Sequence, residues 1–547
     1  MWERFSYYGM RGLLILYLTQ HFLFSDQRSS LIYGAYVSLV YVMSILGGTL
    51  ADRYLGQRKA VTFGAILLVL GHFGMAFEGS GSKQIIAYDG QEYQLTLDGR
   101  GGDAPTILVS GDARSEVTFT DAGATLVLAD PAALGLPQTL ATADYTSRIE
   151  REALYVNILY LSLALIIAGV GFLKPNISTI VGDLYGVGDT RRDSGFTLFY
   201  MGINLGSFLS ALTCGYLGIV VGWAYGFGLA GLGMLVGLVT FLALQHWLEG
   251  KAEPPDPAVL KQSALGPINV EFACYLSALG IIGVSMLLIM NAELAAPMLG
   301  WVGVLMLIAL LFYTFTRLTG DERPRMLAAI YFSLAQIPFW SLFEQAGSSL
   351  NLFTDRLVDR TLFGMTVPAP VFQFLNAGYI VLFAPIIAWL WIFLAKRGAE
   401  PSTPVKFAIG VFGVGLGYLA LVGGMNTAGS NLLTPVIFIF LIYWIHTMAE
   451  LMLSPVGLSA MTKLAPAKAV GLVMGVWFLY TGLSNTLAGV ISAAAGAETI
   501  GGQIVDPEAA LANYASVYTN IAYIAMGIAV VMLLISPIIK SWMRGAR

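Results

Sequence analysis

Long apolar runs bounded by charged or turn residues recur along the chain, and they predict its architecture. The hydrocarbon core of a bilayer is about 30 Å thick, so a spanning helix needs about 20 mostly apolar residues with its backbone bonded internally. A polar, proline-containing stretch from Glu249 to Pro267 separates six such runs from the rest. We predict fourteen helices, arranged as six, two and six, near residues 4–24, 29–51, 59–78, 152–180, 193–217 and 222–247, then 270–292 and 295–316, then 325–350, 371–395, 405–424, 433–462, 469–495 and 512–540.

Residues 79–150 interrupt this pattern. Segments such as Gln84–Asp89 and Tyr93–Asp98 are short, rich in Ile, Val, Thr and Tyr, and separated by Asp-Gly, Gly-Gly and Gly-Asp pairs, which is typical of strands and turns. We predict a small β-rich insert here. Exposed loops tolerate such additions, and partner binding or substrate capture are the functional alternatives; the sequence assigns the insert no role and no partner.

The predicted regions divide the chain into five parts. Helices one to three of an N-terminal bundle occupy 1–78, the β-rich insert 79–150, and helices four to six of the same bundle 151–248. A linker with two extra helices occupies 249–324, and a six-helix C-terminal bundle occupies 325–547.

Composition agrees with a membrane protein. Hydrophobic residues make up 57% of the 547 positions and charged residues only 11%, whereas about a quarter of a soluble domain is charged. The formal net charge of -4 indicates no nucleic-acid surface. Cys214 and Cys274 lie in apolar runs and are expected to be small buried residues. The chain shows no metal cluster, nucleophile elbow or phosphate loop, so we expect neither an enzyme nor a metal or organic cofactor.

Orientation follows from lysine and arginine in the short connections, which favour the cytoplasm. The opposite short connections hold only Arg28, Arg356 and Arg360. We therefore predict both chain ends in the cytoplasm and the β-rich insert on the other side. The basic set comprises Arg53, Arg58, Lys59, Arg191, Arg192, Lys251, Lys261, Arg317, Arg323, Arg325, Lys396, Arg397, Lys406, Lys463, Lys468, Lys540, Arg544 and Arg547.

Several charged residues lie inside the apolar runs. A charge at bilayer depth costs roughly 2.5–3.5 kcal/mol on insertion scales, so each is expected to face a cavity and find a partner. A solute pathway is the favoured interpretation, and ion pairs that only lock helices together are the alternative. These residues are Glu3, Arg4, Arg11, Lys174, Glu344 and Glu450. Helical spacing places Arg4, Tyr8 and Arg11 on one face and His446, Glu450 and Ser454 on another.

Five motifs carry a family resemblance. Gly48–Lys59 (GTLADRYLGQRK), between the second and third predicted helices, is similar to the loop signature of the major facilitator superfamily. Trp2–Arg11 (WERFSYYGMR), Gly171–Asn176 (GFLKPN), Phe199–Gly206 (FYMGINLG) and Glu450–Gly457 (ELMLSPVG) resemble the proton-dependent oligopeptide transporter family. The resemblance covers both six-helix halves. The extra helical pair is similar to that of bacterial members, which implies a bacterial inner membrane. Only the β-rich insert lies outside it.

The resemblance implies proton coupling through Glu3, Arg4, Lys174, Glu344 and Glu450. Glu3 and Arg4 match the second half of a Glu-x-x-Glu-Arg motif, whose first Glu falls one position before Met1. We expect either a chain truncated at this point or a motif without its first acid. Protons would be the coupling ion.

The resemblance also implies a peptide site with two oppositely charged poles. An arginine fork matches a carboxylate, and a lysine provides a compact charge. Trp340 and Trp477 have an alternative interpretation as anchors at the membrane interface. The implied carboxylate-binding residues are Arg4, Arg11, Lys174, Tyr8 and Tyr41; the amine- or backbone-binding residues are Asn204, Glu344, Asn376, Glu450 and Ser454; the pocket residues are Tyr7, Trp340 and Trp477.

By the same resemblance, Arg11 with Glu344 would close the outer side and Lys174 with Glu450 the inner side. The expected function is proton-coupled import of di- and tripeptides by alternating access. Two alternatives stay open: a carrier of nitrate or another small solute on the same fold, and a peptide sensor or receptor that does not transport.

Overall fold

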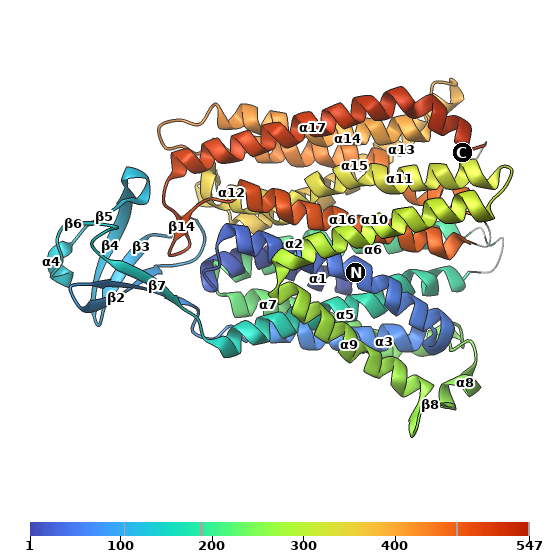
Figure 1. Cartoon of the computed structure of the whole chain (residues 1–547), viewed down its shortest axis with the longest axis horizontal. Helices are drawn as coiled ribbons and strands as arrows, with labels where there is room; N and C mark the ends of the chain where they lie inside the picture. The colour runs from blue at the N-terminus through green and yellow to red at the C-terminus, as the bar shows by residue number, and fades with distance from the viewer. Residues whose placement is uncertain (103, 186–188, 190, 467–468, 545–547) are drawn as a thin grey trace.

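The computed structural model describes residues 1–102, 104–185, 189, 191–466 and 469–544. Two predicted cytoplasmic basic residues, Lys468 and Arg547, lie outside the described residues. Nearly parallel long helices form the body of the molecule, and a small β-sheet projects from one end (Figure 1). We call this end the insert end and the other the opposite end.

The N-terminal half follows the predicted pattern, with differences of a few residues at helix ends. The first helix, α1, ends in a π-helical turn, η1, and α2 continues through a second one, η2, into α3. The elements of this half are α1 (Trp2–Leu16), η1 (Tyr17–His21), α2 (Asp26–Leu50), η2 (Ala51–Leu55), α3 (Gly56–Met75), α5 (Ala153–Asp183), α6 (Arg192–Val220), α7 (Trp223–Leu244) and η4 (Gln245–Leu248).

The linker contributes two long helices that lie against both halves. Cys274 and Ala278 of α9 belong to the apolar core of the N-terminal half, whereas Leu310 of α10 belongs to that of the C-terminal half. The Tyr480 hydroxyl of the C-terminal half donates to the Gly303 carbonyl of α10 at 3.0 Å. The linker comprises α8 (Pro257–Lys261), β8 (Ser263–Leu265), β9 (Ile268–Asn269), α9 (Val270–Met290) and α10 (Ala292–Arg317).

The C-terminal half has one helix that differs from its prediction. The helix expected to end near residue 350 breaks at Ser348, where φ is -126° and ψ is -102°, and resumes as α12. The elements of this half are α11 (Glu322–Phe343), η5 (Glu344–Gly347), α12 (Ser349–Leu357), β10 (Val358–Asp359), β11 (Thr361–Leu362), β12 (Met365–Thr366), η6 (Ala369–Gln373), α13 (Phe374–Lys396), α14 (Thr403–Met425), β13 (Thr434–Pro435), α15 (Ile437–Leu464), α16 (Val470–Ala495), β14 (Thr499–Ile500), β15 (Gln503–Ile504) and α17 (Pro507–Trp542).

The prediction that Arg356 lies in a short connection is wrong, whereas Arg360 does lie in the connection between β10 and β11. Arg356 lies in α12, and its Nη1 donates to Asp26 Oδ2 of α2 at 2.7 Å. Arg360 is also buried, with its Nη2 bonded to the Asp355 carbonyl at 2.9 Å. Each of the two cations is therefore paired inside the protein.

Within the described residues, twelve stretches are long and apolar enough to cross a membrane. The first of them, Asp26–Met75, contains both α2 and α3, and α1, at 15 residues, is not among them. The protein is therefore a multi-pass helical membrane protein by length and composition.

Residues 83–150 contain a seven-stranded antiparallel sheet with the order β6-β5-β4-β3-β2-β1-β7. Its own small core includes Ile86, Leu95, Leu108 and Leu126. The first and last strands pair, so that Lys83 lies opposite Glu150 and the chain enters and leaves the sheet at one place. The insert comprises β1 (Lys83–Tyr88), β2 (Gln91–Leu97), β3 (Thr106–Ser110), β4 (Ala113–Thr120), η3 (Asp121–Gly123), β5 (Thr125–Leu128), α4 (Pro131–Leu134), β6 (Thr139–Ala141) and β7 (Thr146–Glu150).

The two halves meet closely along α2 and α16. A Cβ placed on Gly34 would lie 2.7 Å from the Cα of Gly489, so the backbones touch where neither helix has a side chain. The Ser38 hydroxyl bonds the Gly482 carbonyl at 2.8 Å and the Thr486 hydroxyl at 2.7 Å. Small residues with hydroxyl bonds are typical of helix contacts in membranes, and here they join the halves.

Candidate functional site

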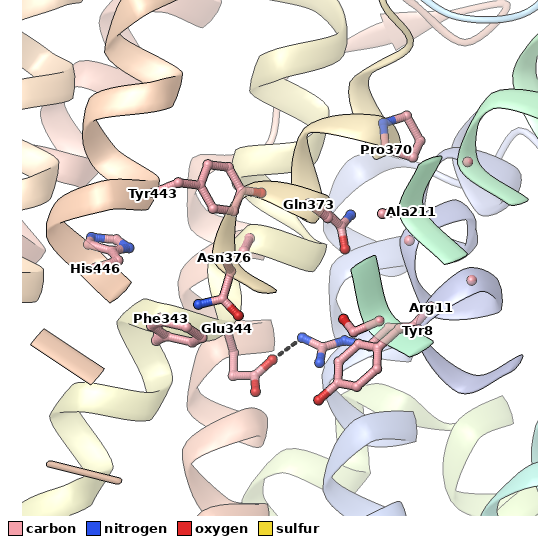
Figure 2. A pocket seen from close by; sticks show the side chains of 15 residues that line it. Tyr8, Arg11, Ala211, Phe343, Glu344, Pro370, Gln373, Asn376, Tyr443 and His446 are labelled. Atoms are coloured by element: carbon pink, nitrogen blue, oxygen red, sulfur yellow. Dashed lines mark hydrogen bonds and ion pairs between the residues drawn. The ribbon is translucent and has the colours of Figure 1, made fainter. Parts of the chain in front are cut away.

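A cavity lies between the two halves (Figure 2). On the N-terminal side, α1 contributes Gly9 and Gly12 beside larger side chains, and on the C-terminal side α13 and α15 face it. A Cβ on Gly9 would lie 2.8 Å from Cys214 Sγ and one on Gly12 3.5 Å from the Gln373 amide, so these glycines let neighbouring elements approach α1 closely. The lining residues are Tyr8, Gly9, Arg11, Gly12, Ser207, Ala211, Gly215, Phe343, Glu344, Ala346, Pro370, Gln373, Asn376, Tyr443 and His446.

An ion pair between Arg11 and Glu344 crosses this cavity. Arg11 Nη2 contacts Glu344 Oε2, and Arg11 Nε donates to the Tyr33 hydroxyl at 2.6 Å. Arg11 is 8% and Glu344 6% exposed. A buried charge that loses its partner is strongly unfavourable, so this pair stabilises the contact between α1 and η5. The predicted contact is present, and its role as a gate stays a prediction.

A second acidic group lies in the C-terminal half. Asn376 Nδ2 donates to Glu450 Oε2 at 2.9 Å and is 3.1 Å from the hydroxyl oxygen of Thr447. Asn376 comes from α13, and both of its partners come from α15. The structure thus brings two predicted amine-binding residues together. Their amide and carboxylate oxygens suit an ammonium group.

On the N-terminal half the predicted cations gather around tyrosines. The Lys174 ammonium lies 3.8 Å from the centroid of the Tyr41 ring, a cation–π contact. Arg4 Nε is 3.2 Å from Glu3 Oε2, so these two residues pair within α1. The structure does not join Lys174 to Glu450: among the described ion pairs there is none between them.

The remaining predicted residues lie outside the cavity lining. Tyr7 stacks on Tyr36 at 6.4 Å between ring centroids, and Asn204 donates to the Tyr200 carbonyl on its own helix at 3.0 Å. Trp340 packs edge-on against Phe343. Ser454 follows Glu450 by one turn of α15. Trp477 belongs to the core of the C-terminal half, where its ring covers Gly457, so the structure does not place it at a membrane interface. Their roles in binding stay predictions.

Sequence reasoning missed Gln373 in η6 and Tyr443 in α15, which both line the cavity. His446, which the helical spacing had placed on one face with Glu450, lines the cavity too. Its Nε2 lies 3.1 Å from the Val414 carbonyl. Spacing was the available signal, because Gln373 precedes Asn376, and Tyr443 precedes His446, by three positions.

Charge is divided between the halves. The N-terminal half carries the cations Arg4, Arg11 and Lys174, with Glu3 paired to the first of them, and the C-terminal half carries Glu344 and Glu450. Such a site can bind a molecule that has a carboxylate at one end and an ammonium at the other. In the described part of the chain, no group of three or more His, Cys, Asp or Glu residues could hold a metal ion.

Comparisons with known proteins agree with this geometry. The model of the POT family matches residues 58–504. The chain is 32% identical to the uncharacterized transporter YclF of Bacillus subtilis, covering 100% of this chain and 93% of the relative. It is 31% identical to the peptide transporter YePEPT of Yersinia enterocolitica, covering 90% of this chain and 85% of the relative.

Solved structures give the same result. A mutant of a peptide transporter in complex with alafosfalin is similar with a TM-score of 0.74 and 30% identity, over 100% of this chain and 94% of the other. A POT family transporter in complex with 5-aminolevulinic acid is similar with a TM-score of 0.72 and 27% identity, over 98% and 94%. On the extent of these matches in sequence and fold, the chain belongs to the POT family.

Proposed function

We propose that this protein is a proton-coupled symporter that imports di- and tripeptides by alternating access. One observation carries the proposal: a cavity between the halves has the buried cation Arg11 on one wall and the acid Glu344 on the other, with Glu450 bonded to Asn376 nearby. A relative named as a peptide transporter covers most of the chain and supports a peptide as the substrate.

A short peptide suits these charges. Its carboxylate would bind Arg4, Arg11 and Lys174, of which the arginines offer planar forks that match two oxygens. Its ammonium would bind Glu450 and Asn376. Because the distance between the poles is limited, the site would select for length, while apolar surfaces discriminate weakly between side chains, by about 1–3 kcal/mol per methylene.

Coupling requires two conformations with different ion pairs. In this structure Arg11 and Glu344 are joined, and Lys174 and Glu450 are not. We assign it to a conformation closed at the insert end. A proton on Glu344 or Glu450 would remove the charge that its partner needs, and one charge crossing 100 mV supplies about 2.3 kcal/mol. A proton gradient is therefore large enough to bias the two states.

We further propose fourteen crossings of a bacterial inner membrane with both chain ends in the cytoplasm. The count takes α2 and α3 separately and adds α1 together with η1. Cysteine labelling tests it. A membrane-impermeant maleimide should label Asp112→Cys in the insert in intact cells, but Lys540→Cys only after permeabilisation. Both positions are exposed, and the native cysteines are buried. The reverse result would invert the topology.

The decisive experiment is uptake of labelled dialanine into proteoliposomes, with and without an inward acid gradient at matched membrane potential. Acceleration by the gradient is expected. Peptide binding without gradient-driven uptake would favour a sensor, and the absence of both would favour nitrate or another small solute. Glu508→Gln, an exposed acid at the start of α17, is the matched control for acid variants in the site.

A further inference from the structure

We propose that the β-rich insert is a latch: it belongs mechanically to the N-terminal half, binds the C-terminal half at the insert end, and must release it before that end can open. The inference rests on the alternating access proposed above. It gives the insert a role within the transport cycle.

The insert is anchored to the N-terminal half at both of its ends. At its exit, Arg151 donates to the carbonyls of Phe22 and Leu23 at 2.7 and 2.6 Å. At its entry, the Glu78 carboxylate accepts from the Ala224 backbone at 3.1 Å, at the start of α7. Because the chain enters and leaves through these two points, a movement of the N-terminal half carries the insert with it.

The sheet also contacts a hairpin of the C-terminal half. This hairpin, β14–β15, lies between α16 and α17 and reaches toward the sheet (Figure 1). The Gly501 backbone donates to Gln84 Oε1 at 2.6 Å, and Gln503 Nε2 donates to the Ala104 carbonyl at 3.0 Å. Val505 packs against Gly123, where a Cβ would lie 2.9 Å from that of Val505. Polar and apolar contacts therefore both join the insert to this hairpin.

The loop between β2 and β3 contacts α12 of the C-terminal half as well. A Cβ on Gly102 would overlap the Asp355 carbonyl oxygen, so the loop approaches α12 as closely as a backbone allows. Gln20 connects the two: its amide nitrogen donates to Asp355 Oδ2 at 2.9 Å, and its oxygen accepts from Gly101 at 3.1 Å. One side chain of the N-terminal half thus binds both the insert and the other half.

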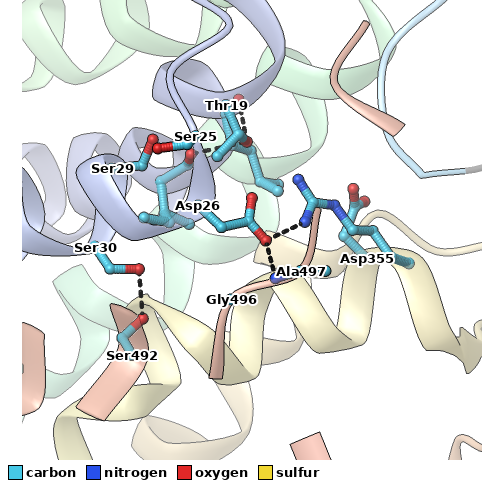
Figure 3. A network of polar contacts seen from close by, with 12 residues as sticks. Thr19, Ser25, Asp26, Ser29, Ser30, Asp355, Ser492, Gly496 and Ala497 are labelled. Atoms are coloured by element: carbon cyan, nitrogen blue, oxygen red, sulfur yellow. Dashed lines mark hydrogen bonds and ion pairs between the residues drawn. The ribbon is translucent and has the colours of Figure 1, made fainter. Parts of the chain in front are cut away.

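These contacts lie close to a buried ion pair between the halves (Figure 3). Asp26 of α2 and Arg356 of α12 have side chains that are 0% and 2% exposed. Asp26 also accepts from the backbone of Ala497, two residues before the β14–β15 hairpin. An insert that releases the hairpin and α12 would uncover the elements that surround this pair. Release of the latch and hydration of the pair are therefore expected to occur together.

The insert is anchored to the N-terminal half. Its contacts with the C-terminal half must therefore break when the two halves separate at the insert end. Removing the insert should raise the population of the conformation that is open there. Lys83 and Glu150 lie opposite each other, so a short Gly-Ser linker can replace residues 83–150 without stretching the chain.

Spin labels at Gln27→Cys and Met365→Cys, exposed positions at the insert end of the two halves, report the opening. The full-length protein should give mainly the short distance. We expect the deletion to raise the long-distance fraction at least about threefold, and Gln503→Ala to raise it less. Gln138→Ala, an exposed glutamine elsewhere in the insert, is the matched control and should change nothing.

Equal distance distributions in the full-length protein, the deletion and Gln503→Ala would overturn the latch. If the deletion fails to fold, Gln503→Ala decides alone. A second test joins Ala104→Cys to Gln503→Cys with a short reducible bis-methanethiosulfonate. Dialanine uptake should stop and return with reductant; undiminished uptake by the joined protein would also overturn the latch. Absence of uptake before joining would contradict the proposed function, while the distance measurement would still test the latch.

Discussion

The insert end and the opposite end of the molecule use charged residues differently. At the insert end, two buried ion pairs, Arg11–Glu344 and Asp26–Arg356, join one half to the other. Toward the opposite end, the Lys174 ammonium lies on the Tyr41 ring of its own half. The charges of the two halves thus meet at one end in this conformation.

Among the described residues, the exposed pairs that leave the N-terminal half at the opposite end join it to the linker. Arg58 binds Glu253 with side-chain exposures of 27% and 40%, and such pairs contribute about 0–1 kcal/mol. Removing one partner of a buried pair destabilises the folded state by about 3–5 kcal/mol. On these energies, we expect the buried pairs between the halves to influence the conformation much more than the exposed pairs do.

The largest effect is expected from Glu344→Gln. It leaves the Arg11 charge buried without an anion, at a cost of up to about 3–5 kcal/mol for the closed insert end. Gradient-driven uptake of dialanine should fall by about two orders of magnitude, and the Gln27–Met365 label distance should lengthen. Uptake like that of Glu508→Gln would show that this pair does not govern the conformation.

Asp26→Asn should come next. The change leaves Arg356 as a buried cation without its partner and should destabilise the protein by about 3 kcal/mol. Removing both charges, by adding Arg356→Gln, should cost less than the sum of the two single changes. Thermal unfolding of all four proteins in one detergent measures the coupling. Simple additivity would mean that the pair contributes no interaction of its own.

Glu450→Gln tests the acid that Asn376 holds in the C-terminal half. A hydrogen bond to a charged group contributes about 1.5–3 kcal/mol, so the KM for dialanine should rise about tenfold or more. An N-acetylated dipeptide, which lacks the ammonium, should be transported equally by both proteins. Unchanged uptake of dialanine would remove Glu450 from the amine site.

The smallest effect is expected from Arg58→Gln. The Arg58 guanidinium holds the pKa of the Glu253 carboxyl, which lies in the linker after α7, below its ordinary value. A lowered folded-state pKa stabilises the protein above the ordinary value and loses this contribution as the pH falls through the folded pKa. The variant should therefore unfold slightly more easily at neutral pH and match the parent in acid. A thermal shift as large as that of Asp26→Asn would erase the contrast between the two ends.

Helix positions were predictable from the sequence because they depend on local pattern. An apolar run in a bilayer has to bond its own backbone, so its length determines a helix whatever surrounds it. The 3.6-residue period likewise placed Tyr8 and Arg11 on one face, and both line the cavity. Motifs on separate helices indicated the family.

Other features depended on partners far away in the chain. Arg356 was predicted in a connection because the apolar run before it ends near residue 350, yet a carboxylate 330 positions away allows it to be buried in a helix. The contact between Gln84 and Gly501 spans 417 positions in the same way.

Local sequence pattern was thus sufficient to place most of the long apolar helices and several of the charged residues inside them, although Arg356 was not among these. The tertiary structure decided which charges pair, and that the insert binds the C-terminal half. The physical reason is that backbone hydrogen bonding in a helix is satisfied within the segment, whereas a buried charge is stable only beside a partner that the fold brings to it.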